Sequence, residues 1–237
     1  MLSRGATPIR GATPIVVWCI FILMPAKYTR REFVEGMPQH IFNRGVEKRK
    51  IFLDDSDYSI FKYYLGIYLL PIEILKKKYI NLPLRLIQTN LNKQLDLQTY
   101  CLMPNHFHLD IIPMNQEVIP KFMRQMTNAY AEYFNKKYDR VGPLLQGRYK
   151  SILLDSEECA VHVHRYIHLN PLRAGLVKSL GGWTWSSYGE YKSLGKSGDD
   201  LCVRNRILSR FRDFSDYKKF LLSEISERED LKVLEID

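Results

Sequence analysis

The 237-residue sequence predicts an α+β fold, in which helices accompany a single antiparallel sheet. Two observations near its centre lead to this expectation. A pair of strands, residues 95–101 and 106–112, is joined by the turn signal Met103-Pro104-Asn105, which is typical of a hairpin. Directly after it, apolar side chains recur at helical spacing from residue 118 to 138. In the first strand apolar and polar residues alternate, which predicts one shared face for Leu95, Leu97, Thr99 and Cys101.

A strand and a helix precede the hairpin. Residues 39–44 read as a strand that ends at the turn signal Asn43-Arg44-Gly45. Three residues then offer N-caps for a helix: Asp54, Asp55 and Ser56. The apolar positions of that helix include Ile60, Phe61, Tyr64, Leu65 and Tyr68. Residues 70–94 show no clear period, because Pro71 and Pro83 interrupt them.

A strand and a helix also follow the central helix, which Gly142-Pro143 separates from the next element. Residues 149–154 read as a strand, and Ser156 opens a last helix that should end near Asn170-Pro171. The complete order is strand, helix, strand, strand, helix, strand. It predicts a ferredoxin-like split βαβ core with an antiparallel sheet, followed by an added C-terminal helix. Three aromatic residues beyond that helix are candidates to cover a sheet edge: Trp183, Trp185 and Tyr188.

The composition indicates an anionic partner and a reducing compartment. The formal charge is +9, and fifteen tyrosines accompany the excess of cations, which suits a surface that binds nucleic acid. The four cysteines are scattered and lack the spacing of a zinc site or a disulfide scaffold: Cys19, Cys101, Cys159 and Cys202. We therefore expect a cytoplasmic protein.

The two ends of the chain differ from the part between them. A hexapeptide at residues 4–9 is repeated at 10–15, and an apolar run to Met24 follows that is too short to span a bilayer. We expect residues 1–23 to be a non-native or disordered extension, with translation beginning at Met24. The alternative is a short membrane-associating or export segment. Residues 24–192 form the predicted domain, and residues 193–237 read as a charged helical tail.

Two histidines dominate the search for chemistry. His106 and His108 lie two apart on a predicted strand, so their imidazoles point to one face while Phe107 faces the core. Two histidines on one strand are half of a site for a divalent cation, or else a hydrogen-bonded pair at a sheet surface. Asp110 shares their face. It either touches the metal or a metal-linked water, or is a solvated strand residue.

The second candidate element is the end of the last helix. Tyr166 and Asn170 lie four apart and share a helix face, so Asn170 can offer an oxygen ligand beside the Tyr166 hydroxyl. Because Asn170 precedes a proline, its helical conformation is disfavoured, and the shared face depends on whether the helix reaches it. His162 lies one turn before Tyr166 and is an accessory candidate to line the site.

Both elements resemble the REP-associated tyrosine transposases, relatives of the single-tyrosine HUH transposases of small insertion sequences. The main motifs are YCLMPNHFHL at residues 100–109 and RYIHLNPLRAGLV at 165–177. The resemblance covers roughly residues 28–192, and further segments occur in family order: His40 to Gly45, Ile51 to Tyr58, Tyr133 to Tyr138, Gly142 to Ser151 and Trp185 to Tyr188.

The resemblance implies a ferredoxin-like core and cleavage of single-stranded DNA near hairpins. It assigns the nucleophile to Tyr166, which becomes linked to the 5′ phosphate. It assigns the metal ligands to His106, His108 and Asn170, with Mg²⁺ or Mn²⁺ as the cofactor. The expected partner is single-stranded DNA with a hairpin, and no membrane. The protein is expected to act as a monomer or a homodimer.

Two other functions stay open from the sequence. One is a non-catalytic hairpin-binding protein derived from a transposase. The other is a zinc hydrolase that uses His106, His108 and Asp110 and forms no covalent tyrosine adduct.

Overall fold

The computed structural model describes residues 33–80, 82–193 and 200–226. Its sheet has four antiparallel strands in the order β2-β3-β1-β4. The strands are β1 (Gln39–Arg44), β2 (Leu95–Met103), β3 (His106–Pro113) and β4 (Lys150–Leu153). Two helices complete the repeat, α2 (Asp55–Leu69) and α5 (Val118–Lys137). This order confirms the predicted ferredoxin-like core, and the residues predicted for β1 match the observed strand.

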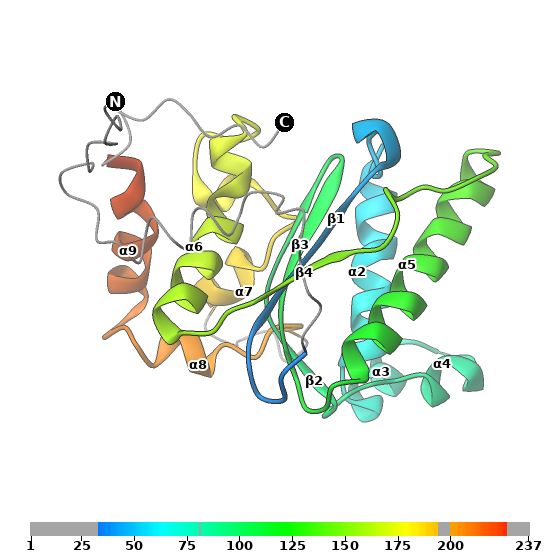
Figure 1. Cartoon of the computed structure of the whole chain (residues 1–237), viewed down its shortest axis with the longest axis horizontal. Helices are drawn as coiled ribbons and strands as arrows, with labels where there is room; N and C mark the ends of the chain where they lie inside the picture. The colour runs from blue at the N-terminus through cyan, green and yellow to red at the C-terminus, as the bar shows by residue number, and fades with distance from the viewer. Residues whose placement is uncertain (1–32, 81, 194–199, 227–237) are drawn as a thin grey trace, which may run out of the picture.

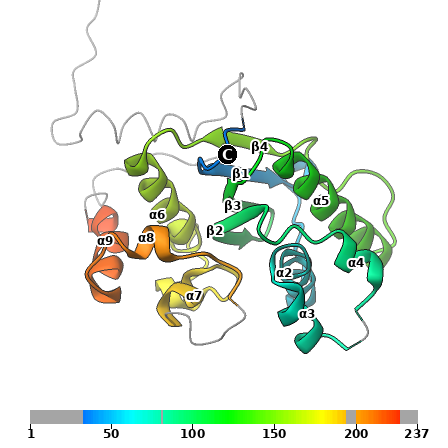
Figure 2. The ribbon, with the colours of Figure 1, turned by 90° about the horizontal axis from the view of Figure 1, so that it is seen from below.

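Helices cover both faces of the sheet (Figures 1 and 2). Helices α2 and α5 lie on one face. The other face is covered by α6 (Glu157–Arg173) and α7 (Tyr188–Ser193), and α9 (Phe214–Ser226) packs on the far side of α6. Because both faces are covered, eight of the nine residues of β2 are buried. The expectations for residues 1–23 lie outside the described residues.

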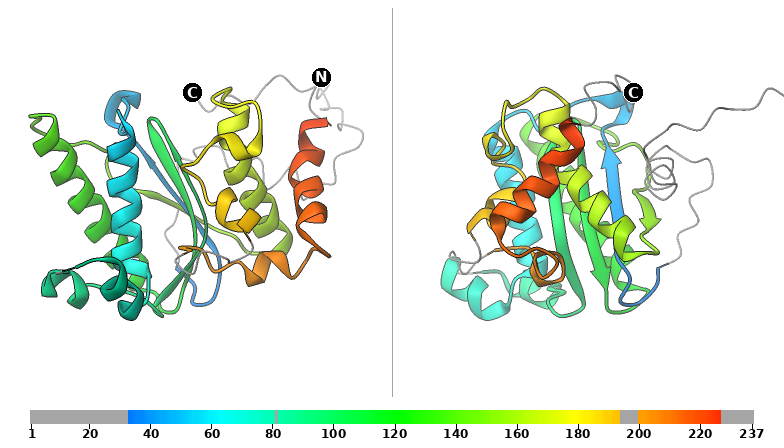
Figure 3. Two further views of the ribbon diagram at one scale, coloured as in Figure 1. Left: turned by 180° about the vertical axis from the view of Figure 1, so that it is seen from behind. Right: turned by 90° about the vertical axis from the view of Figure 1, so that its left-hand side faces the viewer.

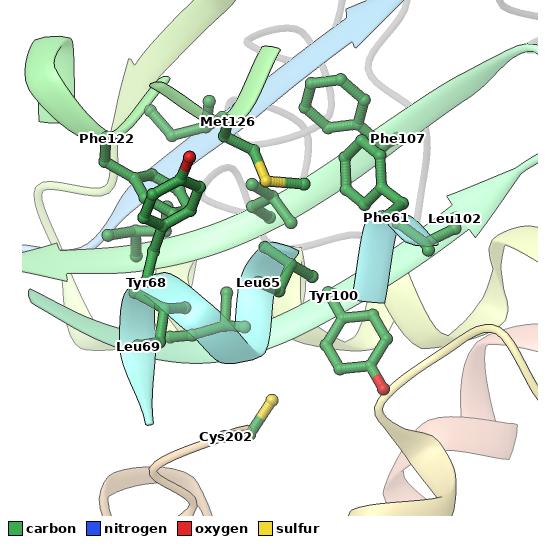
Figure 4. Close-up of a cluster of buried hydrophobic side chains, with 14 of the residues drawn as sticks. Phe61, Leu65, Tyr68, Leu69, Tyr100, Leu102, Phe107, Phe122, Met126 and Cys202 are labelled. Carbon is green, nitrogen blue, oxygen red and sulfur yellow. The ribbon is translucent and has the colours of Figure 1, made fainter. Parts of the chain in front are cut away.

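The larger apolar core fills the space between the sheet and the α2–α5 layer (Figure 4), and it extends to buried residues of α7 and α9. Helix α2 begins with a capping box: the Asp54 side chain accepts from the Asp57 amide, and the Asp57 side chain accepts in return from the Asp54 amide. The apolar face of α2 then packs on the sheet and on α5. The buried side chains of this core include Phe61 and Leu65 of α2, Phe107 of β3, and Phe122 and Met126 of α5. The sheet face that α2 and α5 cover carries none of the candidate site residues.

A β-bulge in β2 overturns the predicted face of that strand. The register with β3 shifts between Leu97 and Thr99, so the alternation of side chains changes phase there. Leu95, Leu97 and then Tyr100 belong to the α2–α5 core, while Cys101 packs in a second cluster with α6. The expectation that Leu95, Leu97, Thr99 and Cys101 share one face is therefore wrong, because an extra residue interrupts the two-residue period.

The segment between α2 and β2 contains two short helices, α3 (Ile72–Lys78) and α4 (Leu84–Gln88). Two asparagines fasten it to the end of α2. The Asn90 amide donates to the carbonyl of Ile67 at 2.6 Å, and the Asn92 amide donates to the carbonyl of Leu69 at 2.8 Å. These bonds satisfy carbonyl groups that a helix end leaves without partners.

The edge strand β2 is covered by residues 183–188, as the aromatic residues there suggested. The Leu102 amide donates to the carbonyl of Trp185, and the Ser187 amide donates to the carbonyl of Tyr100. The Trp183 ring nitrogen also donates to the Leu102 carbonyl at 2.9 Å. This cover satisfies backbone groups that an exposed edge would offer to another chain.

Residues 200–226, expected as part of a helical tail, pack against α6 (Figure 3). They contain the short helix α8 (Asn205–Leu208) as well as α9. Tyr217 and Leu221 of α9 are fully buried in the larger core. On the surface, Glu157 at the start of α6 pairs with Arg206 and Arg210.

The described helices are too short or too polar to cross a bilayer. The three cysteines within the described ranges, Cys101, Cys159 and Cys202, are buried and form no disulfide.

Candidate active site

Helix α6 carries Tyr166 and Asn170, and the sequence predicts where it begins. It begins after Ser156, whose hydroxyl accepts from the Cys159 amide at 3.1 Å. It continues through Pro171 to Arg173, two residues past the expected end near Asn170-Pro171.

A Schellman motif ends α6 beyond the proline. Gly175 has φ +67° and takes the left-handed position of a Schellman motif. Its amide donates to the Leu172 carbonyl at 3.1 Å, and the Leu176 amide donates to the Pro171 carbonyl at 3.0 Å. These two bonds satisfy the carbonyls of the last turn. Asn170 therefore stays helical, four residues after Tyr166 on the same face.

The two histidines lie side by side on β3. The ring centroids of His106 and His108 are 4.9 Å apart, while Phe107 and Leu109 point to the opposite face and are fully buried. The prediction that both imidazoles share a face is therefore confirmed. Strand β1 runs beside this part of β3, with Phe42 opposite His108 and Arg44 opposite His106.

Helix α6 brings its two candidate residues to this pair of histidines. The Tyr166 ring lies edge-on to His108, with centroids 5.5 Å apart. The Asn170 side chain makes a hydrogen bond with His106 and another with Tyr166. Four residues that lie far apart in the sequence therefore meet: two on the sheet and two on one turn of a helix.

The donor atoms at this point fit a divalent cation. The His106 Nδ1 lies 2.6 Å from the Asn105 Oδ1, which can only accept, so the Nε2 of His106 carries the lone pair. The Nε2 of His108 and the Nδ2 of Asn170 are buried, and neither has a hydrogen-bond partner within the described ranges. Turning the Asn170 amide over would place its oxygen where the nitrogen lies. Two imidazole nitrogens and one amide oxygen are the donor atoms that would serve as ligands, with the Asn170 bond to His106 given up when a cation binds.

Burial controls the protonation of the site. It lowers the pKa of His106 to about 4 and the pKa of His108 further, so both imidazoles are neutral, as metal ligands must be. Burial also raises the pKa of Tyr166, and the Asn170 side chain and the charge of Arg173 act in the opposite direction. At neutral pH the Tyr166 side chain is therefore a phenol with cationic and hydrogen-bonding groups beside it.

The two accessory candidates lie elsewhere. Asp110 is buried, and burial raises its pKa to about 7, so the interpretation as a solvated strand residue is wrong. Its electrostatic neighbours, Arg206 and Tyr191, come from the C-terminal part of the chain. His162 contacts Arg165, with its Nδ1 at 2.7 Å from the guanidinium, and its ring lies 6.2 Å from that of Phe220. It therefore faces α9.

A zinc site of the hydrolase type finds no support in the part of the chain that the structure describes. No three side chains from His, Cys, Asp and Glu gather there into a metal-binding group. A cation bound by His106 and His108 would depend on the amide of Asn170 as the third ligand.

Sequence reasoning missed two residues of this site. His40 on β1 stacks on His108, with ring centroids 5.1 Å apart, and Arg173 lies over the Tyr166 ring. The pairing of β1 with β3 brings His40 to the site, and a sequence gives no register between strands. Arg173 follows Tyr166 by seven residues, which is two helical turns, but the expected helix end concealed this relationship.

The opposite side of α6 holds a buried hydrogen-bond chain. The Tyr217 hydroxyl lies 2.8 Å from His164 Nε2 and 2.6 Å from His168 Nδ1. The chain continues from His164 Nδ1 to the Thr99 hydroxyl, and from His168 Nε2 to the Ser187 hydroxyl at 2.7 Å. One α9 side chain therefore links two positions of the helix that carries Tyr166.

The chain is similar to known transposases in sequence and in fold. The sequence model of the family described as "Transposase IS200 like" matches residues 73–170. A solved structure of a REP-associated tyrosine transposase bound to a REP hairpin is similar, with a TM-score of 0.50 and 16% sequence identity. The similarity covers 74% of this chain and 90% of that chain.

A crystal structure described as a candidate transposase from Deinococcus radiodurans R1 gives a TM-score of 0.35 at 17% identity, over 59% of this chain and 95% of that one. No curated protein sequence matches the chain significantly. Residues 73–170, which include His106, His108, Tyr166 and Asn170, match the model of the IS200-like transposase family, and the chain shares the fold of a REP-associated tyrosine transposase.

Proposed function

We propose that this protein cleaves and rejoins single-stranded DNA at hairpin-associated sites, with Tyr166 as the covalent nucleophile. The observation that carries this proposal is the convergence of Tyr166 and Asn170 with the paired histidines His106 and His108. A tyrosine hydroxyl beside neutral imidazoles and an amide suits attack on a phosphodiester more than it suits binding alone.

The proposed reaction conserves the energy of the cleaved bond. The Tyr166 oxygen attacks the phosphorus, a tyrosine–phosphate ester forms, and the bond from phosphorus to the 3′ oxygen breaks. The proton lost by the phenol ends on the released 3′ hydroxyl. Because one phosphate ester replaces another, the reverse attack by a 3′ hydroxyl rejoins the strand without ATP. Strand transfer requires this property, and simple hydrolysis does not.

His106, His108 and Asn170 are the residues that would hold Mg²⁺ or Mn²⁺ in the proposed mechanism. When bound, such a cation neutralises charge on the phosphate oxygens and orients the phosphate for in-line attack. The protein's own contribution is positional. The rigid strand β3 fixes both imidazoles, and α6 keeps the Tyr166 hydroxyl within hydrogen-bond reach of Asn170.

The proposed partner is single-stranded DNA that contains a hairpin. Three observations support it: the net charge of +9, the family match, and the fold shared with a transposase solved with a REP hairpin. We also propose that the protein works in the cytoplasm, because the DNA that it would act on lies there and the three described cysteines form no disulfide.

The test is one incubation with two variants. Purified protein is mixed with an end-labelled single-stranded hairpin DNA and Mg²⁺ or Mn²⁺, and the products are separated under denaturing conditions. The wild type should give a protein–DNA adduct and a fragment with a free 3′ hydroxyl. Tyr166→Phe should give neither but should still shift the hairpin in a native gel, because only the attacking oxygen is lost.

Tyr149→Phe is the matched control, since it removes a hydroxyl from a tyrosine beside β4, and it should form the adduct normally. An adduct that persists in Tyr166→Phe would move the nucleophile elsewhere. Hairpin binding by the wild type without any cleavage would instead identify a non-catalytic binding protein.

A further inference from the structure

His40 contacts the histidine pair from the neighbouring strand. It lies on β1, directly opposite Asp110 of β3. Phe42, two residues further along β1, lies opposite His108. The His40 ring stacks on that of His108 at an interplanar angle of 21°, and the two rings meet through their nitrogens. The His40 Nε2 lies 2.9 Å from the His108 Nδ1, and His40 is only 1% exposed.

This contact decides which His108 nitrogen can bind a metal. A neutral imidazole has one N–H group and one bare nitrogen. If His108 donates through Nδ1, its Nε2 carries the lone pair. If His40 donates instead, the Nε2 of His108 carries a hydrogen and cannot be a ligand. The buried Nε2 has no hydrogen-bond partner among the described residues, so the contact at Nδ1 is the only one that selects the tautomer there.

His106 shows the same arrangement with a different partner. Its Nδ1 faces an oxygen of Asn105, an atom that only accepts, so its Nε2 is bare. Each histidine of the pair thus has a neighbour at Nδ1, and in each case Nε2 is the nitrogen left for other contacts. Metal-bound histidines commonly have such a partner, which fixes the ring and the tautomer.

We infer that His40 is a positioning residue of the metal site: it accepts the Nδ1 hydrogen of His108 and so presents the Nε2 lone pair of His108 toward Asn170 and Tyr166. This inference rests on the proposed function, because it concerns how His108, a ligand of the proposed cation, is held in place. His40 does not touch the substrate or the ion and acts only through His108.

The same arrangement fixes the hydrogen of His40 on its Nδ1, which is buried without a partner in the described part of the chain. The residue opposite His40 on the ladder, Asp110, has a buried Oδ1 that also lacks a partner. The His40 Nδ1 and the Asp110 Oδ1 are not hydrogen-bonded to each other, so that hydrogen of His40 has no acceptor among the described residues.

The first experiment measures metal affinity without any DNA. Mn²⁺ binding is followed by electron paramagnetic resonance and calorimetry for the wild type, His40→Phe and His40→Gln. His40→Phe keeps a flat ring but has no acceptor, so it should weaken Mn²⁺ binding about 10- to 100-fold. His40→Gln offers an oxygen at similar reach and should restore most of the affinity. His162→Phe, a histidine that faces α9, should bind Mn²⁺ as the wild type does.

The second experiment reads the tautomer directly. Side-chain ¹⁵N NMR on the Mg²⁺-loaded wild type should show His108 with its hydrogen on Nδ1. An Nε2–H form of His108 in the loaded protein would overturn the inference, even if His40→Phe failed to fold.

The outcomes separate this inference from the proposed function. A wild type that binds neither Mn²⁺ nor Mg²⁺ refutes the metal-dependent function itself. A wild type that binds Mn²⁺, together with a folded His40→Phe of equal affinity, refutes only the role of His40.

Discussion

The guanidinium of Arg173 lies 5.4 Å from the centre of the Tyr166 ring, two helical turns further along α6. This position exists only because α6 continues through Pro171 and ends in the Schellman motif at Gly175. A cation over a phenol ring favours the phenolate, and the charge of Arg173 indeed lowers the pKa of Tyr166 against the larger effect of burial.

Replacing Arg173 with glutamine should therefore slow cleavage at neutral pH. Loss of the positive charge raises the pKa of Tyr166 further, so a smaller fraction of the phenol ionises at a given pH. We expect the rate to fall by about tenfold, equivalent to roughly 1.4 kcal/mol. The rising limb of the pH–rate profile should move to higher pH, and Arg173→Lys should recover part of the rate. An unchanged profile in Arg173→Gln would assign no role to this cation.

Removing either histidine ligand should abolish metal-dependent cleavage. His106→Ala and His108→Ala each leave one imidazole and one amide, too few to hold a hard cation in place. Circular dichroism should report a folded protein for both variants, because the residues that pack the larger core lie on the other face of β3. If both variants cleave at the wild-type rate with Mg²⁺ present, the histidines are structural.

Acid should destabilise the protein well above the pH at which its carboxylates titrate. Burial or partial burial lowers the pKa of five of the six histidines: His40, His106, His108, His164 and His168. Below about pH 6.5 the unfolded chain binds protons that the folded chain does not. Each such histidine therefore costs up to about 1.4 kcal/mol of stability per pH unit, until the pH falls through its folded pKa.

Asp110 acts in the opposite direction, because its raised pKa favours the folded state as the pH falls from about 7 toward its unfolded value near 4. It offsets only one of the five histidines. Urea unfolding between pH 8 and pH 5 should thus show stability falling steeply below pH 6.5. A free energy of unfolding that stays constant down to pH 5 would contradict the buried, neutral state of these side chains.

Tyr217→Phe should destabilise the fold by about 1–3 kcal/mol, since it leaves buried imidazole nitrogens of His164 and His168 without their shared partner. Thermal and urea unfolding measure the loss. Tyr63→Phe removes the same hydroxyl from a half-buried tyrosine of α2 and serves as the control, with a change below about 0.5 kcal/mol expected. Equal stability of the two variants would show that the hydrogen-bond chain contributes nothing.

Hairpin binding should weaken steeply as salt rises, because cations of the protein displace counterions from the DNA backbone. The slope of log affinity against log salt should be about −0.7 to −0.9 for each phosphate contacted. Binding should also favour the folded single strand over the same sequence as a perfect duplex. Affinity that is insensitive to salt, or equal for the duplex, would argue against this mode of recognition.

The parts of the fold that follow from local periodicity were predictable from sequence. The order of strands and helices, the shared face of His106 and His108, and the N-cap at Ser156 each depend on residues close together in the chain. The bulge near Gln98 was not predictable, because one extra residue changes the phase of a strand without a Gly or Pro to mark it. The end of α6 was missed because Pro171 is a usual stop signal, and the compensating bonds involve residues beyond it.

Relationships between distant segments account for the remaining differences. His40 reaches the site through the register of β1 with β3, and Tyr217 reaches α6 from α9. Asp110 seemed a surface residue because its strand neighbours gave no sign that the C-terminal segment covers that face. The contacts of His40 and Tyr217 join residues at least 49 positions apart. The burial of Asp110 depends on where the C-terminal helices pack, which the sequence alone does not give.

The sheet carries the apolar layer of α2 and α5 on one face and the candidate chemistry on the other. This separation gives the two faces different freedom to change. Substitutions among the apolar residues of α2 and α5 alter how firmly the sheet is held, and they do not touch Tyr166 or its neighbours. A library confined to that layer should therefore yield more heat-resistant forms with the same cutting preference. New target choice, in contrast, has to arise in the loops and helices on the α6 side.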